Sequence, residues 1–273
     1  DNVITDKYNH ASIMDGIFLS LGMTRDVEVH RFIHGNLKDL EAKLAKIPEN
    51  EPKLIVTDGV FSMEGDIADL PAIKALADRY GAGVYLDEAH AIGVLGRGGR
   101  GTTEHYGSAD LADVIMCTFS KSFGSIGGFL AGDADVIEYV KHVARPLIFS
   151  ASMPPANIAA VLATLDIIEK EPERVHRLQA IARRMIEGFR TIGYDIGTAE
   201  TPIVPLVIGS DEKTFLLWKA LFERGVYVNP VVSPAVPPNR ALLRTSYMAI
   251  HTDEELDLIL NIAEDEGRKL GVV

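Results

Sequence analysis

Residues 84–87 read Val84-Tyr85-Leu86-Asp87, a short apolar run that ends in an acid. A similar run, Lys53-Leu54-Ile55-Val56-Thr57-Asp58, precedes it, and residues 71–80 between the two have a helical pattern. Further apolar runs follow at residues 113–118 and 128–131. Apolar strands that alternate with helices are typical of a mostly parallel sheet flanked by helices. We therefore predict an α/β fold for this part of the chain.

The sequence pattern changes after about residue 165. Residues 172–193 have the periodicity of one long amphipathic helix. Thr252 and Glu255 have the spacing of a capping box, which predicts the start of a final helix. We predict two domains, a large one over residues 1–165 and a smaller α+β domain over residues 166–273. The strands expected in the smaller domain lie at residues 203–208, near 226–228 and at 241–244.

Composition excludes several classes of protein. The 273 residues include 27 Lys and Arg against 39 Asp and Glu, a formal net charge of -12 that disfavours binding to nucleic acid. Cys117 is the single cysteine, so no internal disulfide can form, which is typical of a reducing compartment and predicts a cytoplasmic protein. No apolar stretch approaches the roughly 18 residues that a membrane span requires.

Two other motifs suggest classes of protein that the rest of the sequence does not support. Asp87-Glu88-Ala89-His90 has the letters of a helicase box, but the sequence contains no phosphate-binding loop of the form G-x-x-x-x-G-K-[ST]. His30 and His34 are four residues apart, yet the residues between them have an extended pattern that would separate the two rings. We therefore predict neither a helicase nor a metal site.

An acid and a lysine follow two of the predicted strands. Asp87 ends one strand, and Thr118-Phe119-Ser120-Lys121-Ser122 follows another. Open α/β sheets bind their ligands at the carboxyl ends of the strands, so both groups are expected to face one crevice. A lysine can form a Schiff base with an aldehyde, and an acid can pair with a protonated ring nitrogen. This combination predicts a site for pyridoxal 5'-phosphate.

Several longer motifs carry a family resemblance. The sequence resembles the α-oxoamine synthase family of pyridoxal-phosphate enzymes, which have the type I fold of aspartate aminotransferase. The likeness covers essentially the whole chain. The motifs are Asp6-Lys7-Tyr8-Asn9-His10-Ala11-Ser12, Asp58-Gly59-Val60-Phe61-Ser62-Met63-Glu64-Gly65-Asp66, Leu86-Asp87-Glu88-Ala89-His90, Thr118-Phe119-Ser120-Lys121-Ser122, Phe149-Ser150-Ala151-Ser152-Met153-Pro154-Pro155 and Leu243-Arg244-Thr245-Ser246.

The resemblance implies roles around the cofactor ring. Lys121 is expected to bind the aldehyde and to act as the catalytic base. Asp87 is expected to pair with the pyridine nitrogen, and His10 to stack on the ring. His90 and Ser62 are expected to donate hydrogen bonds near the phenolic oxygen.

The resemblance also implies roles at the phosphate and at the substrate. Thr118 and Ser120 are expected to bind the phosphate, and Ser150 to reach the phosphate of a neighbouring subunit in a homodimer. Arg244 is expected to bind the carboxylate of an amino acid. From the residues alone, an arginine in an apolar strand requires an anionic partner, and an internal salt bridge is the alternative.

The activity implied by the resemblance joins an amino acid to an acyl-CoA thioester, with decarboxylation, and yields an α-amino ketone. Residues 229–238 and 245–249 are most similar to bacterial serine palmitoyltransferases, which implies L-serine as the substrate. Glycine C-acetyltransferase (2-amino-3-ketobutyrate CoA ligase) and 8-amino-7-oxononanoate synthase are the alternatives. Ala235 stands where the latter enzymes usually have threonine.

Two further expectations follow from the resemblance. Degenerate, non-catalytic subunits of this family have lost the lysine, whereas Lys121 is retained here. Catalysis is therefore favoured over a non-catalytic pyridoxal-phosphate-binding subunit. Family members also carry an N-terminal segment with a phosphate-binding turn and part of the acyl-CoA site. Because the first residues already resemble the interior of a domain, we expect such a segment to precede Asp1.

Overall fold

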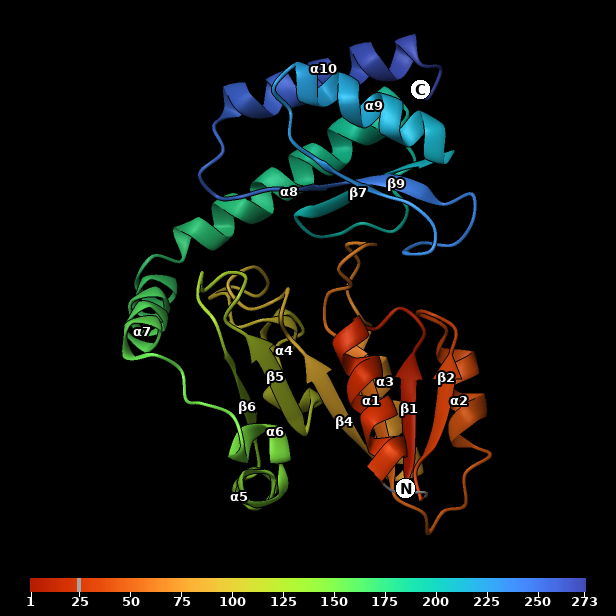
Figure 1. Ribbon diagram of the computed structural model, residues 1–273, viewed down its shortest axis with the longest axis vertical. Helices are drawn as coiled ribbons and strands as arrows, with labels where there is room; N and C mark the ends of the chain where they lie inside the picture. The colour runs from red at the N-terminus through yellow and green to blue at the C-terminus, as the bar shows by residue number, and fades with distance from the viewer. Residues whose placement is uncertain (24–25) are drawn as a thin grey trace. The chain divides into compact units, whose positions relative to one another are not determined.

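The computed structural model describes residues 1–23 and 26–273, which form two compact units (Figure 1). The first unit contains Asp1–Phe61 and Ile67–Pro172, and the second contains Ser62–Asp66 and Glu173–Val273. The division after Pro172 differs from the one predicted after residue 165, because helix α7 (Pro155–Lys170) belongs to the first unit. No helix in the described part of the chain is both long and apolar enough to cross a membrane.

The first unit is built on a six-stranded, mostly parallel sheet, which confirms the predicted fold class. Its strand order is β2-β1-β3-β4-β5-β6, and only β6 runs antiparallel to its neighbour. The strands are β1 (Asn2–Asp6), β2 (Glu28–Phe32), β3 (Lys53–Asp58), β4 (Ala82–Asp87), β5 (Val114–Thr118) and β6 (Gly128–Gly132).

Helices flank this sheet, and local sequence sets their ends. In α3 (Leu70–Tyr80), the Asp69 carboxylate accepts a hydrogen bond from the Ala72 amide at 3.2 Å, and Gly81 ends the helix with a φ of 64°. Leu70 and Ile73 pack into the same core as the strand residues. The other helices of this unit are α1 (Ala11–Met23), α2 (Leu37–Leu44), α4 (Thr102–His105), α5 (Ala134–Val143) and α6 (Arg145–Ile148), with a 3-10 turn at Ala109–Leu111.

The second unit packs three long helices on a three-stranded antiparallel sheet. The strands are β7 (Ile203–Gly209), β8 (Asn229–Val231) and β9 (Ala241–Ser246), in the order β7-β9-β8. The helices are α8 (Glu173–Ile192), α9 (Asp211–Glu223) and α10 (Asp253–Lys269). The capping box at Thr252 and Glu255 forms as predicted. The strand predicted near residues 226–228 is wrong, because pairing with β9 starts only at Asn229, opposite Arg244.

A five-residue segment, Ser62–Asp66, belongs to the second unit although it lies between two parts of the first. The carbonyl oxygen of Gly65 accepts hydrogen bonds from the amide of Thr201 at 3.1 Å and from its hydroxyl at 2.9 Å. Arg244 Nε donates to the Ser62 carbonyl oxygen at 2.6 Å. Gly65 has a φ of 70°, and a Cβ there would lie 2.0 Å from the Ile203 carbonyl oxygen. Only glycine fits this close approach of two backbones.

Replacing Gly65 by alanine should therefore lower the free energy of unfolding by about 3–5 kcal/mol, from backbone strain and overpacking together. Gly81 is the matched control, because its φ is 64° but a Cβ there meets no atom within 4 Å. Gly81→Ala should cost about 1 kcal/mol. Urea denaturation of both variants measures the difference, and equal losses would contradict the close packing at Gly65.

Candidate active site

The site begins with the register of two neighbouring parallel strands. Asp58 ends β3 and Asp87 ends β4, and the two residues are direct partners in the sheet. The Gly59 amide donates a hydrogen bond to the Asp87 carbonyl oxygen at 2.8 Å, which locks the two strand ends together. Strand β5, on the other side of β4, ends at Thr118. Two acids and a hydroxyl thus leave adjacent strands at the same edge of the sheet.

A cavity of about 330 Å³ lies at this edge. Six of the nine residues predicted for the site line it: His10, Asp87, His90, Thr118, Ser120 and Lys121. Ser12, Asp58, Val60, Ala89 and Met116 complete the lining. Residues from four separate parts of the chain are brought together, as the resemblance implies.

The turn after β5 holds Lys121 in place. Thr118 Oγ1 and Ser120 Oγ share a hydrogen bond at 2.9 Å, and the Gly124 amide donates to the Lys121 carbonyl oxygen at 3.0 Å. Phe119 and Phe123, on either side of the lysine, make an edge-to-face contact with ring centroids 5.1 Å apart. This aromatic contact anchors the turn, while both hydroxyls and the amine remain at the cavity.

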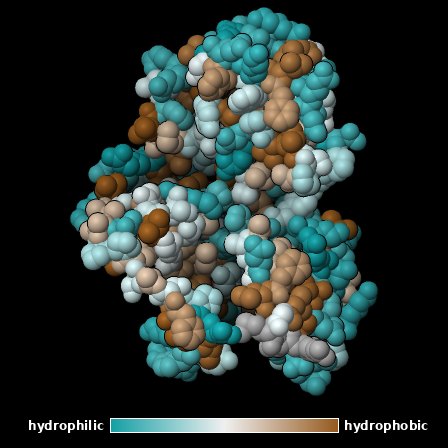
Figure 2. Space-filling model, in the orientation of Figure 1, coloured by the Kyte–Doolittle hydropathy of each residue, from teal (hydrophilic) through white to brown (hydrophobic). Residues whose placement is uncertain are grey.

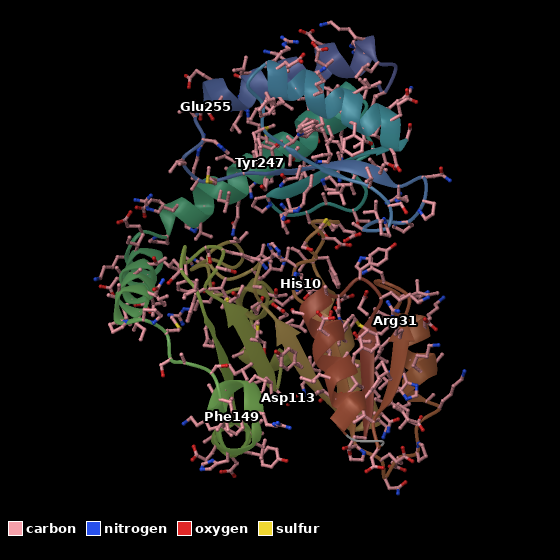
Figure 3. The ribbon with its side chains drawn as sticks, in the orientation of Figure 1. His10, Arg31, Asp113, Phe149, Tyr247 and Glu255 are labelled. Carbon is pink, nitrogen blue, oxygen red and sulfur yellow. The ribbon has the colours of Figure 1, made fainter. Side chains whose placement is uncertain are left out.

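His10 lies immediately before α1, at the end of the sheet toward which the arrowheads of β1 and β4 point (Figures 1 and 3). Its amide donates a hydrogen bond to Asp58 Oδ2 at 3.0 Å. Its ring Nδ1 is hydrogen-bonded to Ser12 Oγ at 2.8 Å. The backbone of His10 is thus attached to β3, and the imidazole is an exposed side chain in the lining of the cavity.

Asp58 is a site residue for which the sequence analysis predicted no role. Only 4% of Asp58 and 5% of Asp87 is exposed. Burial, followed by the nearby charge of Asp87, raises the pKa of Asp58 to about 8, although the His10 amide and Lys121 oppose the shift. The available signal was the sequence itself, since Asp58 ends an apolar run in the same way as Asp87 does.

Glu88 directly follows β4 and anchors the end of that strand through hydrogen bonds to Thr102 and to β5. Its carboxylate is completely buried and accepts hydrogen bonds from the Thr102 hydroxyl at 2.7 Å and from the Thr102 amide at 2.8 Å. The Glu88 amide donates to the Met116 carbonyl oxygen of β5 at 2.7 Å. Burial raises the pKa of Glu88 to about 7, and the hydrogen bonds from Thr102 and Thr103 limit the shift.

The other three predicted residues do not line this cavity. Ser150 is exposed just after α6, and its expected role at a neighbouring subunit stays a prediction. Ser62 and Arg244 belong to the second unit, and their expected roles also stay predictions. Arg244 lines a cavity of about 530 Å³ within that unit, and burial lowers the pKa of its guanidinium. Within the second unit, the described residues include no carboxylate that forms an ion pair with Arg244, and its Nε donates to the Ser62 carbonyl oxygen.

Comparison with known proteins agrees with this geometry. The sequence model of the family described as aminotransferase class I and II matches residues 1–262, and the chain belongs to this family. A serine palmitoyltransferase from Sphingobacterium spiritivorum is 48% identical over 94% of the chain and 63% of its own length. An 8-amino-7-oxononanoate synthase from Thermosipho melanesiensis is 42% identical over 100% of the chain and 68% of its own length.

A solved structure, described as SPT with PLP internal aldimine, superposes with a TM-score of 0.94 at 36% identity. The match covers 100% of this chain and 68% of that structure. The chain thus spans less than two thirds of the length of the serine palmitoyltransferase from Sphingobacterium spiritivorum, and 68% of the structural relative.

The raised pKa of Glu88 predicts a pH-dependent stability. Its pKa is about 7 in the folded protein against an ordinary value of 4.5, so the folded state binds the extra proton between these two pH values. The free energy of unfolding should fall as the pH rises from about 5 to about 7, by up to about 3 kcal/mol. Glu88→Gln should abolish this part of the pH dependence.

Urea denaturation at several pH values between 5 and 7.5 measures the effect. The control is Glu169→Gln, which removes an exposed acid from α7 and should leave the pH dependence as in the unmodified protein. The same slope in Glu88→Gln as in the unmodified protein would show that Glu88 does not carry the proton.

Proposed function

We propose that the protein is a pyridoxal-phosphate-dependent α-oxoamine synthase that condenses an amino acid, L-serine, with an acyl-CoA thioester, with decarboxylation, to give an α-amino ketone. The relatives named serine palmitoyltransferase support L-serine as the substrate. The observation that carries the proposal is the cavity that joins Asp87 and Lys121. These two residues come from the ends of different strands and supply the acid and the amine that an aromatic aldehyde of this kind requires.

The donor set of the cavity fits the cofactor. Lys121 would hold the aldehyde, and the buried Asp87 carboxylate would accept a hydrogen bond from the ring nitrogen. Thr118 and Ser120 place two hydroxyls and the Ser120 amide close together, which suits a phosphate. When bound, pyridoxal phosphate supplies an electron sink for a carbanion at the amino acid's Cα.

The protein's own residues account for the proton transfer. The amine of Lys121 would act as the general base that accepts the Cα proton of the bound amino acid. The Asp87 carboxylate keeps its orientation because its Oδ1 accepts a hydrogen bond from the Ala89 amide at 2.9 Å. His10 lines the cavity and would stack on the ring, and the hydrogen bond from its amide to Asp58 Oδ2 attaches its backbone to β3.

Arg244 would bind the substrate carboxylate. Its Nε donates to the Ser62 carbonyl oxygen, which orients the guanidinium and leaves its two terminal nitrogens for an anion. Two parallel hydrogen bonds from a planar fork suit a carboxylate. The lack of an acidic partner for Arg244 within the described residues supports this assignment.

The relatives also support a second candidate. Several 8-amino-7-oxononanoate synthases are 40–44% identical over the whole chain. The higher identity to serine palmitoyltransferases, 45–48%, and the alanine at position 235 favour serine. Glycine C-acetyltransferase is a third possibility within the same chemistry.

We also propose that the protein acts in the cytoplasm as a homodimer with shared active sites. Hydrophobic side chains gather on the surface over α1, where Phe18 and Leu19 are exposed (Figure 2). Near Ser150, Phe149 is 79% exposed beside α6 (Figure 3). Exposed apolar surface of this extent is typical of a face that a second subunit covers.

The first test of the proposal is the attachment of the cofactor to Lys121. After incubation with pyridoxal phosphate and reduction with borohydride, the mass should increase by one cofactor, and the modified peptide should contain Lys121. Lys121→Ala should lose both the visible absorbance band and the labelled peptide, because no other lysine lines the cavity among the described residues. Lys141→Ala, on an exposed face of α5, is the control. Labelling elsewhere would overturn the proposal.

Titration with amino acids tests the substrate. L-Serine should give a clearer spectral change in the cofactor-loaded protein than glycine or L-alanine. Arg244→Lys should weaken the apparent affinity for serine about 10- to 150-fold, since one charge-assisted hydrogen bond contributes about 1.5–3 kcal/mol. Arg183→Lys, on the exposed side of α8, is the control. A response to glycine or alanine alone would contradict the assignment of serine.

A further inference from the structure

Asp58 has no part in the chemistry described above, yet it is buried in the same cavity. It lies in register with Asp87 on the neighbouring strand, and both carboxylates line the cavity. Asp58 Oδ2 accepts the hydrogen bond from the His10 amide, whereas Oδ1 accepts none from the described residues. Two buried acids thus lie on neighbouring strands at one cavity, and only one of them is required at a ring nitrogen.

The charged groups around Asp58 do not neutralise it. Among the described residues, no cation forms an ion pair with its carboxylate. Asp87 and Asp6, at the ends of the strands on either side, both disfavour a second negative charge, and Lys121 opposes them. The titratable groups that face Asp58 or line its cavity are Asp6, His10, Tyr85, Asp87, His90 and Lys121.

We propose that Asp58 is a positioning residue that is protonated at neutral pH, so that Asp87 is the single negative charge of the pair and Asp58 holds the His10 backbone as a neutral acceptor. Two adjacent buried carboxylates cannot both ionise readily, and one of them keeps a proton. Asp87 Oδ1 already accepts a hydrogen bond from the Ala89 amide, and Asp87 is the acid that the proposed function places at the ring nitrogen. The proton therefore resides on Asp58. This inference deepens the proposed function and rests on it for the role of Asp87.

A neutral Asp58 has two consequences for the site. Its Oδ2 still accepts the hydrogen bond from the His10 amide, so the residue before α1 stays attached to β3. Its other oxygen carries the proton, so the cavity has one anionic and one neutral acid beside Lys121. Asparagine has nearly the same shape, is neutral at every pH and retains an acceptor, so it can replace a protonated Asp58. Alanine cannot.

Carbon-13 NMR of the full chain with labelled aspartate carboxyl groups tests the protonation without the cofactor. One aspartate should titrate with a midpoint near pH 8 and should be missing from Asp58→Asn. Asp87→Asn should lower that midpoint by at least one pH unit, because it removes the neighbouring charge. Asp113 lies at the opposite end of the sheet, where its carboxylate accepts a hydrogen bond from the Val84 amide (Figure 3). The control variant Asp113→Asn should therefore leave the midpoint unchanged. Titration of every aspartate below pH 5 would overturn the proposal.

Visible circular dichroism of the cofactor-loaded protein tests the positioning of His10. Asp58→Asn should retain most of the signal between pH 7 and 9.5, whereas Asp58→Ala should lose at least half of it. Equal losses in the two variants would refute the role of Asp58 as an acceptor for His10. The two tests can fail separately. A protein that binds no pyridoxal phosphate would refute the proposed function, whereas the NMR titration, which needs no cofactor, would still decide whether Asp58 is protonated.

Discussion

The parallel register of β3, β4 and β5 is the constraint on which the site depends. Each of these strands ends in a polar residue, and the hydrogen bond from the Gly59 amide to the Asp87 carbonyl oxygen prevents one end from sliding past the other. A shift of one residue would turn Asp87 to the other face of the sheet. The cavity, the position of His10 and the turn that carries Lys121 all follow from this alignment.

The same alignment concentrates buried acids, which is unfavourable for folding. Asp58 and Glu88 both have a raised pKa because burial disfavours their charged forms. The hydrogen bonds from Thr102 to Glu88 and from the His10 amide to Asp58 offset part of this cost. Asp58 lines the cavity, and an acid with a strongly shifted pKa in a cavity is typical of a functional site.

Much of the first unit could be predicted from the sequence, because its strands are apolar runs with polar ends. Asp87 and Lys121 were predicted from that pattern, and the family motifs added His10, His90, Thr118 and Ser120. Asp58 fits the same pattern, and its register with Asp87 and its place in the lining of the cavity then indicate what it does there. Ser62–Asp66 belongs to the second unit, where the backbone of Gly65 closely approaches that of Ile203. A contact between two backbones produces no periodic pattern in the sequence, so it could not be predicted. Near residues 226–228, apolar character predicted a strand, although Val226 and Val228 are buried without pairing.

The central claim is that Asp87 and Lys121 hold opposite ends of one aromatic aldehyde. A crystal structure of the protein soaked with pyridoxal phosphate tests it most directly. The account predicts continuous density from Lys121 Nζ to the aldehyde carbon, with an Asp87 carboxylate oxygen within hydrogen-bond distance of the ring nitrogen. Density for the cofactor in another cavity, or a ring bound to Lys121 with its nitrogen away from Asp87, would contradict it.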